Sequence, residues 1–72
     1  MKMTEKVISA LKNGNESKLY LAMYDFYYSN YSIEASETFN QWKSEVKEYE
    51  RNMIIRAEQR ILENEKYFNS LF

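Results

Sequence analysis

The residues of this chain that could do chemistry are carboxylates and phenols, because its 72 residues include eleven Asp and Glu and seven Tyr but no His and no Cys. Without His and Cys, the Ser-His-Asp and Cys-His triads are excluded, and the usual soft and imidazole metal ligands are missing. A single Gly excludes a glycine-rich phosphate loop. A pair of Glu residues acting as acid and base would need a pocket, for which so short a chain leaves little room. We therefore expect a non-enzymatic protein without a cofactor or a metal.

Carboxylates recur at spacings that place them along one side of a helix. They are Glu34, Glu37, Glu45 and Glu48. The simpler interpretation is a solvated face that forms ion pairs with Lys and Arg on a neighbouring edge. The alternative is a row of charges that imitates a phosphate backbone and occupies a basic groove on a nucleic-acid-binding protein.

Tyrosines recur at helical spacing in the middle of the chain. They are Tyr20, Tyr24, Tyr27, Tyr28 and Tyr31. Packing in the core would explain this spacing, and so would a protein interface, since Tyr offers a large rigid surface and a hydroxyl at low entropic cost. Stacking on single-stranded nucleic acid is a third interpretation, but only Lys18 is nearby to hold phosphates. We take Tyr20, Tyr24, Tyr27 and Tyr31 as candidates for contact with a partner.

The elements that must position these residues are predicted to be helices, which makes the fold class all-α. Thr4 can cap a first helix over residues 5–12, and Asn13-Gly14 is a natural stop. Asn15 or Ser17 would cap a second helix over residues 16–31. In the rival interpretation, Asn13-Gly14 is the turn of a hairpin between strands at residues 7–11 and 18–24.

The remainder of the chain reads as one long amphipathic helix over residues 34–70. It carries no Gly and no Pro, and apolar residues recur at steps of three, four or seven. We expect the two short helices to pack on this helix, so that residues 1–72 form a single small helical domain. The exact start of the long helix is left open by several candidate caps between residues 32 and 38.

The second half of this long helix has apolar residues on two faces. Ile55 and Leu62 lie seven apart, on the side opposite Met53. A chain of this length buries only about 60% of its unfolded surface, and without disulfides an oligomer is the remaining source of stability. We therefore predict a homodimeric helical bundle. Its interface residues would be Met53, Ile54, Ile55 and Leu62. In the alternative, the two short helices cover both faces within one chain.

Charge and hydropathy limit the partners and the cellular location that we expect for this chain. The net charge is −1, so no bulk attraction to nucleic acid or to an anionic membrane is expected. The first residues lack the apolar run of a signal peptide, and no stretch approaches the length of a membrane span, so we expect a cytoplasmic protein. Abundant Tyr, Asn, Lys and Ile suggest an AT-rich gene of a bacterium or a phage. Two other functions stay open, a helix-turn-helix DNA-binding regulator with Lys12 and Lys18 near phosphates, and a structural assembly subunit.

The chain ends in Phe68-Asn69-Ser70-Leu71-Phe72. This segment resembles the bacterial sliding-clamp-binding pentapeptide, whose consensus is Gln-Leu-Ser/Asp-Leu-Phe. Ser70, Leu71 and Phe72 match the last three positions, while Phe68 and Asn69 replace the Gln and Leu. The resemblance implies that Leu71 and Phe72 enter an apolar pocket on the clamp of DNA polymerase, and that acidic residues face the basic channel of the clamp. The alternative is that Leu71 and Phe72 only close the apolar stripe.

A protein of this kind would resemble phage-encoded inhibitors that block host DNA replication. The expected function is therefore that of a small regulator or inhibitor that occupies the surface of a larger bacterial protein, with the sliding clamp as the named partner.

Overall fold

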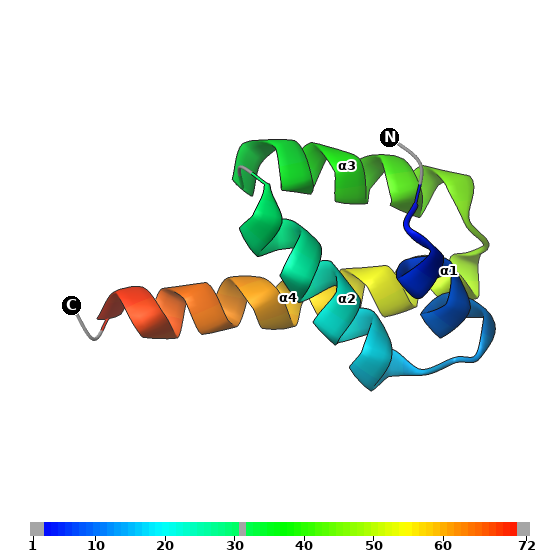
Figure 1. Ribbon diagram of the computed structural model, residues 1–72, viewed down its shortest axis with the longest axis horizontal. Helices are drawn as coiled ribbons and strands as arrows, with labels where there is room; N and C mark the ends of the chain where they lie inside the picture. Colours follow the sequence, from blue (N-terminus) through cyan, green and yellow to red (C-terminus); the bar gives the residue numbers. More distant parts are fainter. Residues whose placement is uncertain (1–2, 31, 71–72) are drawn as a thin grey trace.

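The fold is an all-helical bundle. The computed structural model describes residues 3–30 and 32–70, with the backbone alone at residue 32 and residues 67–70. Four helices follow one another in these ranges (Figure 1), namely α1 (Glu5–Lys12), α2 (Glu16–Ser29), α3 (Ser32–Glu45) and α4 (Glu48–Ser70). The all-α prediction is confirmed, and the hairpin alternative is wrong because both of its strands lie in helices.

The turn between α1 and α2 has the predicted caps. The Thr4 side chain accepts a hydrogen bond from the Val7 backbone N–H, and the Asn15 side chain accepts one from Lys18 N–H. Gly14 has a φ of +63°, a conformation that costs Gly nothing. The Asn15 N–H bonds to the Ala10 carbonyl at 2.9 Å, which completes a Schellman motif at the end of α1. The first predicted helix is thus confirmed in full, while the second ends at Ser29 rather than residue 31.

The single long helix predicted over residues 34–70 is wrong. The chain breaks at Val46-Lys47 and turns back, so that α3 packs along α4 (Figure 1). Phe39 and Trp42 of α3 are completely buried in the core that also contains Ile54 of α4. A straight helix would hold these aromatic rings far from the second half of the apolar stripe. Burial of both halves in one core therefore favours two helices over one.

Side chains stabilise this turn. Arg51 Nε donates to the Lys43 carbonyl at 2.8 Å, which satisfies one of the carbonyls that the end of α3 leaves without a helical partner. Ser44 Oγ donates to the Gln41 carbonyl at 2.6 Å. Lys43 Nζ lies 2.5 Å from Glu58 Oε1, so a half-buried ion pair joins α3 to α4.

The core draws on all four helices. Its buried apolar residues are Val7, Ala10, Leu11, Leu19, Met23, Tyr27, Ala35, Phe39, Trp42, Met53, Ile54, Ala57 and Ile61. Against this core packs the half-buried Phe26, whose ring centroid lies 5.8 Å from that of Phe39 and 5.2 Å from that of Trp42, distances at which aromatic rings attract one another.

The molecule is elongated, with principal-axis extents of 38 × 22 × 19 Å. The cause is α4, which continues past the ends of the other three helices (Figure 1). None of the described helices combines the length and the hydropathy needed to cross a membrane.

Candidate interaction surfaces

The predicted tyrosines lie where α2 crosses the second half of α4. The Arg60 guanidinium lies 4.1 Å from the centroid of the Tyr20 ring, and Asn64 Nδ2 donates to the Tyr20 hydroxyl. Seven residues further along α2, the Tyr27 hydroxyl donates to Oε2 of Glu65, the residue after Asn64, at 2.5 Å. These polar contacts fix the position of α2 on α4.

Only part of the tyrosine set is available to a partner. Tyr27 is 6% exposed and belongs to the core, so its predicted role in partner contact does not fit this fold. Tyr20 is half-buried, Tyr24 and Tyr28 are 39% and 54% exposed, and Tyr31 lies outside the described residues.

The three outer tyrosines form a row of adjacent rings. The centroids of Tyr20 and Tyr24 are 5.8 Å apart, and those of Tyr24 and Tyr28 are 4.6 Å apart. Partial desolvation in this row raises the pKa of Tyr28 above 10.0, and the neighbouring Tyr24, Glu65 and Tyr20 raise it further. The row is therefore a continuous aromatic surface, in which the Tyr28 hydroxyl stays protonated at neutral pH.

The predicted dimer interface on α4 needs correction. Met53 is 1% exposed and Ile54 is fully buried, because α2 and α3 of the same chain pack against α4. These two side chains cannot form the centre of an interface between copies in this fold. Ile55 is half-buried, and Leu62 is 39% exposed.

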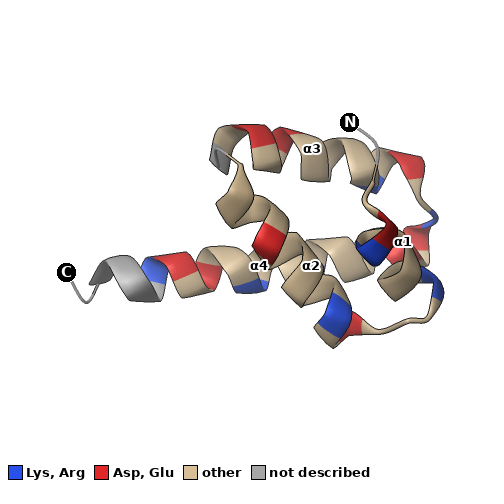
Figure 2. Ribbon diagram, in the orientation of Figure 1, with Lys and Arg blue, Asp and Glu red and all other residues tan. Residues whose placement is uncertain are grey.

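The predicted acidic strip is exposed but does not form a straight rod. Glu34, Glu37 and Glu45 belong to α3, whereas Glu48 begins α4 after the turn. Acidic residues nevertheless predominate on α3 (Figure 2). The one base of α3, Lys43, is held by Glu58. The exposed surface of α3 is therefore negatively charged.

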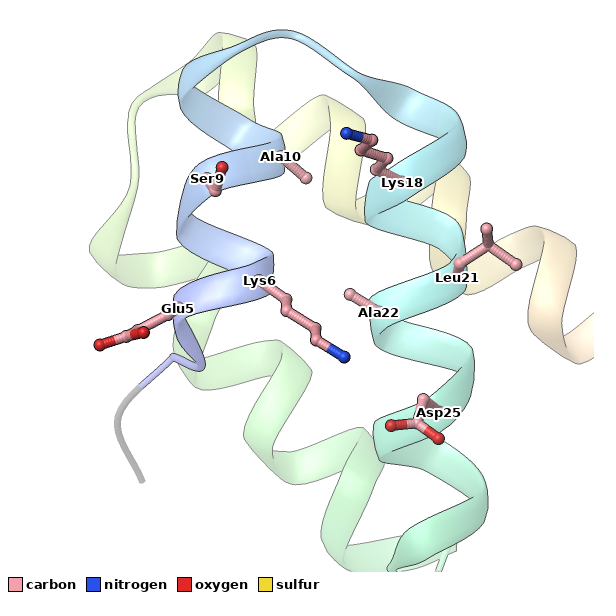
Figure 3. Close-up of a pocket in the computed structure, with 8 residues that line it drawn as sticks. All are labelled: Glu5, Lys6, Ser9, Ala10, Lys18, Leu21, Ala22 and Asp25. Atoms are coloured by element: carbon pink, nitrogen blue, oxygen red, sulfur yellow. The ribbon is translucent and has the colours of Figure 1, made fainter.

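A groove between α1 and α2 was not anticipated from the sequence. It has a volume of about 610 Å³. Its lining residues are Glu5, Lys6, Ser9, Ala10, Lys18, Leu21, Ala22 and Asp25 (Figure 3). A second hollow of about 410 Å³ shares four of these residues and extends the groove toward the end of α2. Small side chains at facing positions, Ala10 and Ala22, are the sequence signal that could have indicated it.

The C-terminal motif begins within the last turn of α4. The exposed residues Glu63, Asn64 and Lys66 precede it, and Ser70 is the last helical residue. Leu71 and Phe72 lie outside the described residues. Over the described part of the chain, no group of three or more acidic side chains is arranged to hold a metal ion.

Comparison of the chain with protein-family models, with curated proteins and with solved structures found no match. The arguments about function therefore depend on the surfaces described above.

Proposed function

We propose that this chain is a non-enzymatic binding protein that regulates or inhibits a larger bacterial protein by occupying part of its surface, and that the partner is the DNA polymerase sliding clamp. The observation that carries this proposal is the projection of α4 beyond the other helices (Figure 1). Helix α4 extends to Ser70, so the segment that resembles the clamp-binding motif begins in the last turn of a helix that continues past the other three.

This placement matters because the motif acts by inserting apolar side chains into a pocket on its partner. The last buried core residue of α4 is Ile61, and the described side chains from Leu62 to Lys66 are exposed or half-buried. The described segment that leads to the motif therefore takes no part in the buried core.

The negatively charged surface of α3 supports the same partner. Glu34, Glu37 and Glu45 are exposed on it, and a surface with one sign of charge attracts an oppositely charged partner at a distance. The resemblance implies a basic channel in the clamp, which these carboxylates would approach as the motif docks.

Direct DNA binding is the weaker candidate. α1 and α2 are joined by a three-residue turn that contains Gly14, as in many helix-turn-helix units. However, the charged residues of α2 are Glu16, Lys18 and Asp25, and a helix with one base and two acids is poorly suited to a phosphate backbone.

The test is a binding measurement on a purified bacterial sliding clamp. Wild type is expected to bind. The double variant Leu71→Ala/Phe72→Ala is expected to bind at least about 100-fold more weakly, because burial of each large apolar side chain contributes about 1.5–3 kcal/mol to the binding free energy. Tyr49→Ala, which changes an exposed aromatic residue at the opposite end of α4, is the matched control. Circular dichroism should show equal helicity for all three proteins.

Two results would contradict the proposal in different ways. If wild type does not bind the clamp, the named partner is wrong. If the double variant binds as tightly as wild type, the motif does not mediate the contact. In that case, clamp binding by the double variant Glu34→Lys/Glu37→Lys shows whether the α3 surface mediates the contact instead.

A further inference from the structure

The side of α2 that borders the groove carries opposite charges at equal distances from its midpoint. Lys18 and Asp25 are seven residues apart, and Leu21 and Ala22 lie halfway between them. All four residues line the groove between α1 and α2 (Figure 3). They therefore share one stripe of the helix, with a positive end, a small apolar centre and a negative end.

The groups of this stripe are free to accept a partner. Lys18 and Asp25 are exposed and form no ion pair with any described residue. Leu21 is 62% exposed. Figure 3 shows the Lys18 side chain over the groove and Leu21 pointing outward from α2.

We infer that this stripe is an interface between two copies of the chain, in which α2 packs antiparallel against α2 of a second copy about a two-fold axis. In that arrangement Lys18 faces the partner subunit's Asp25, and Asp25 faces the partner subunit's Lys18. Both charge pairs can form at once, because the distance between Lys18 and Asp25, about 10 Å along the axis, is the same on the two identical helices.

The centre of the stripe supplies the apolar contact. The two-fold axis passes between Leu21 and Ala22, so Leu21 of each copy packs over the partner subunit's Ala22. The small side chains Ala10 and Ala22 leave the groove open, which provides room for the incoming Leu21. Burial of a Leu side chain on both sides of the axis favours association.

Charge complementarity selects a second copy in this orientation. A parallel arrangement would place Lys18 against Lys18 and Asp25 against Asp25, which is repulsive. Lys6 extends from α1 toward Asp25 across the groove (Figure 3) and adds a second positive charge near this carboxylate. The residues of the stripe belong to α2 and are distinct from the exposed carboxylates of α3.

The test is sedimentation equilibrium of charge variants. Wild type is expected to dimerise, and Lys18→Glu or Asp25→Lys alone should raise the dimer dissociation constant at least about tenfold, because each creates two like-charge contacts. An equimolar mixture of the two variants should form a heterodimer, since both of its charge pairs are attractive. The double variant Lys18→Glu/Asp25→Lys should regain the homodimer.

Lys47→Glu is the matched control, because it reverses an exposed Lys in the turn between α3 and α4. It should dimerise as wild type does. The inference is overturned if wild type sediments as a monomer at every concentration, if either single variant associates as tightly as wild type, or if the mixture of single variants stays monomeric. Circular dichroism verifies that each variant is folded, which is expected since the substituted side chains are exposed.

Discussion

Replacement of Arg51 by Met tests the reason why residues 32–70 form two helices rather than one. Arg51 Nε donates to the Lys43 carbonyl at 2.8 Å, and Nη2 lies 3.5 Å from the Val46 carbonyl. The side chain thus bonds to backbone carbonyls at the end of α3 and in the turn. Met preserves most of the aliphatic volume and removes the donors.

The expected loss of stability follows from the bond between Arg51 Nε and the Lys43 carbonyl. Hydrogen bonds of charged groups contribute about 1.5–3 kcal/mol, but Arg51 is exposed, and solvent screening reduces this figure to about 1 kcal/mol. For a domain of this size, the expected fall in Tm is about 4–8 °C. Thermal and urea unfolding, monitored by circular dichroism, would measure it.

Arg56→Met is the matched comparison, because Arg56 forms an ion pair with Glu16 rather than with the backbone. Their side chains are 54% and 56% exposed, and such pairs are worth about 0.5 kcal/mol or less. Arg51→Met should therefore destabilise the protein more than Arg56→Met. Equal losses, or a neutral Arg51→Met, would refute the view that this side chain stabilises the turn.

Three further predictions concern the packing of the helices. Gly14→Ala should lower the free energy of unfolding by about 1–2 kcal/mol, because φ at this position is +63°. The added Cβ would also lie 2.9 Å from the Tyr49 hydroxyl. The loss should persist when Tyr49→Phe removes this hydroxyl, because the backbone strain remains. Lys43→Met should lower the free energy of unfolding, measured in urea, by about 1–2 kcal/mol, because it leaves the half-buried Glu58 carboxylate unpaired. The double variant Lys43→Met/Glu58→Met removes both charges, so its free energy of unfolding should come within about 1 kcal/mol of wild type. The raised pKa of Tyr28 means that the unfolded chain loses this phenolic proton first as the pH rises above 10.0, so stability should fall there and fall less steeply in Tyr28→Phe.

Local signals predicted the first half of the fold correctly. Thr4 and Asn15 accept hydrogen bonds from backbone N–H groups within three residues, and Gly14 adopts a positive φ that few other residues tolerate. Each of these features depends on a short stretch of sequence. The first helix and the start of the second were therefore predictable from the residues alone.

The break between α3 and α4 was not predictable in the same way. Residues 34–70 carry no Gly or Pro, and the groups that stabilise the turn are long side chains such as Arg51, whose role depends on a chain that has already reversed. The same reversal explains the error at Met53 and Ile54. Their two-faced apolar pattern was assigned to a second copy, but the pattern does not distinguish a partner helix from the other helices of the same chain.

The described side chains of α4 beyond Ile61 lie outside the buried core. Before this point, α4 places Met53, Ile54, Ala57 and Ile61 in the core, and an ion pair at Glu58 joins it to α3. Beyond Ile61, the described helix contacts α2 through the polar groups of Asn64 and Glu65. Helix α4 thus combines apolar contacts up to Ile61 with polar contacts beyond it, which is why it can continue past the core while α2 keeps its position on it.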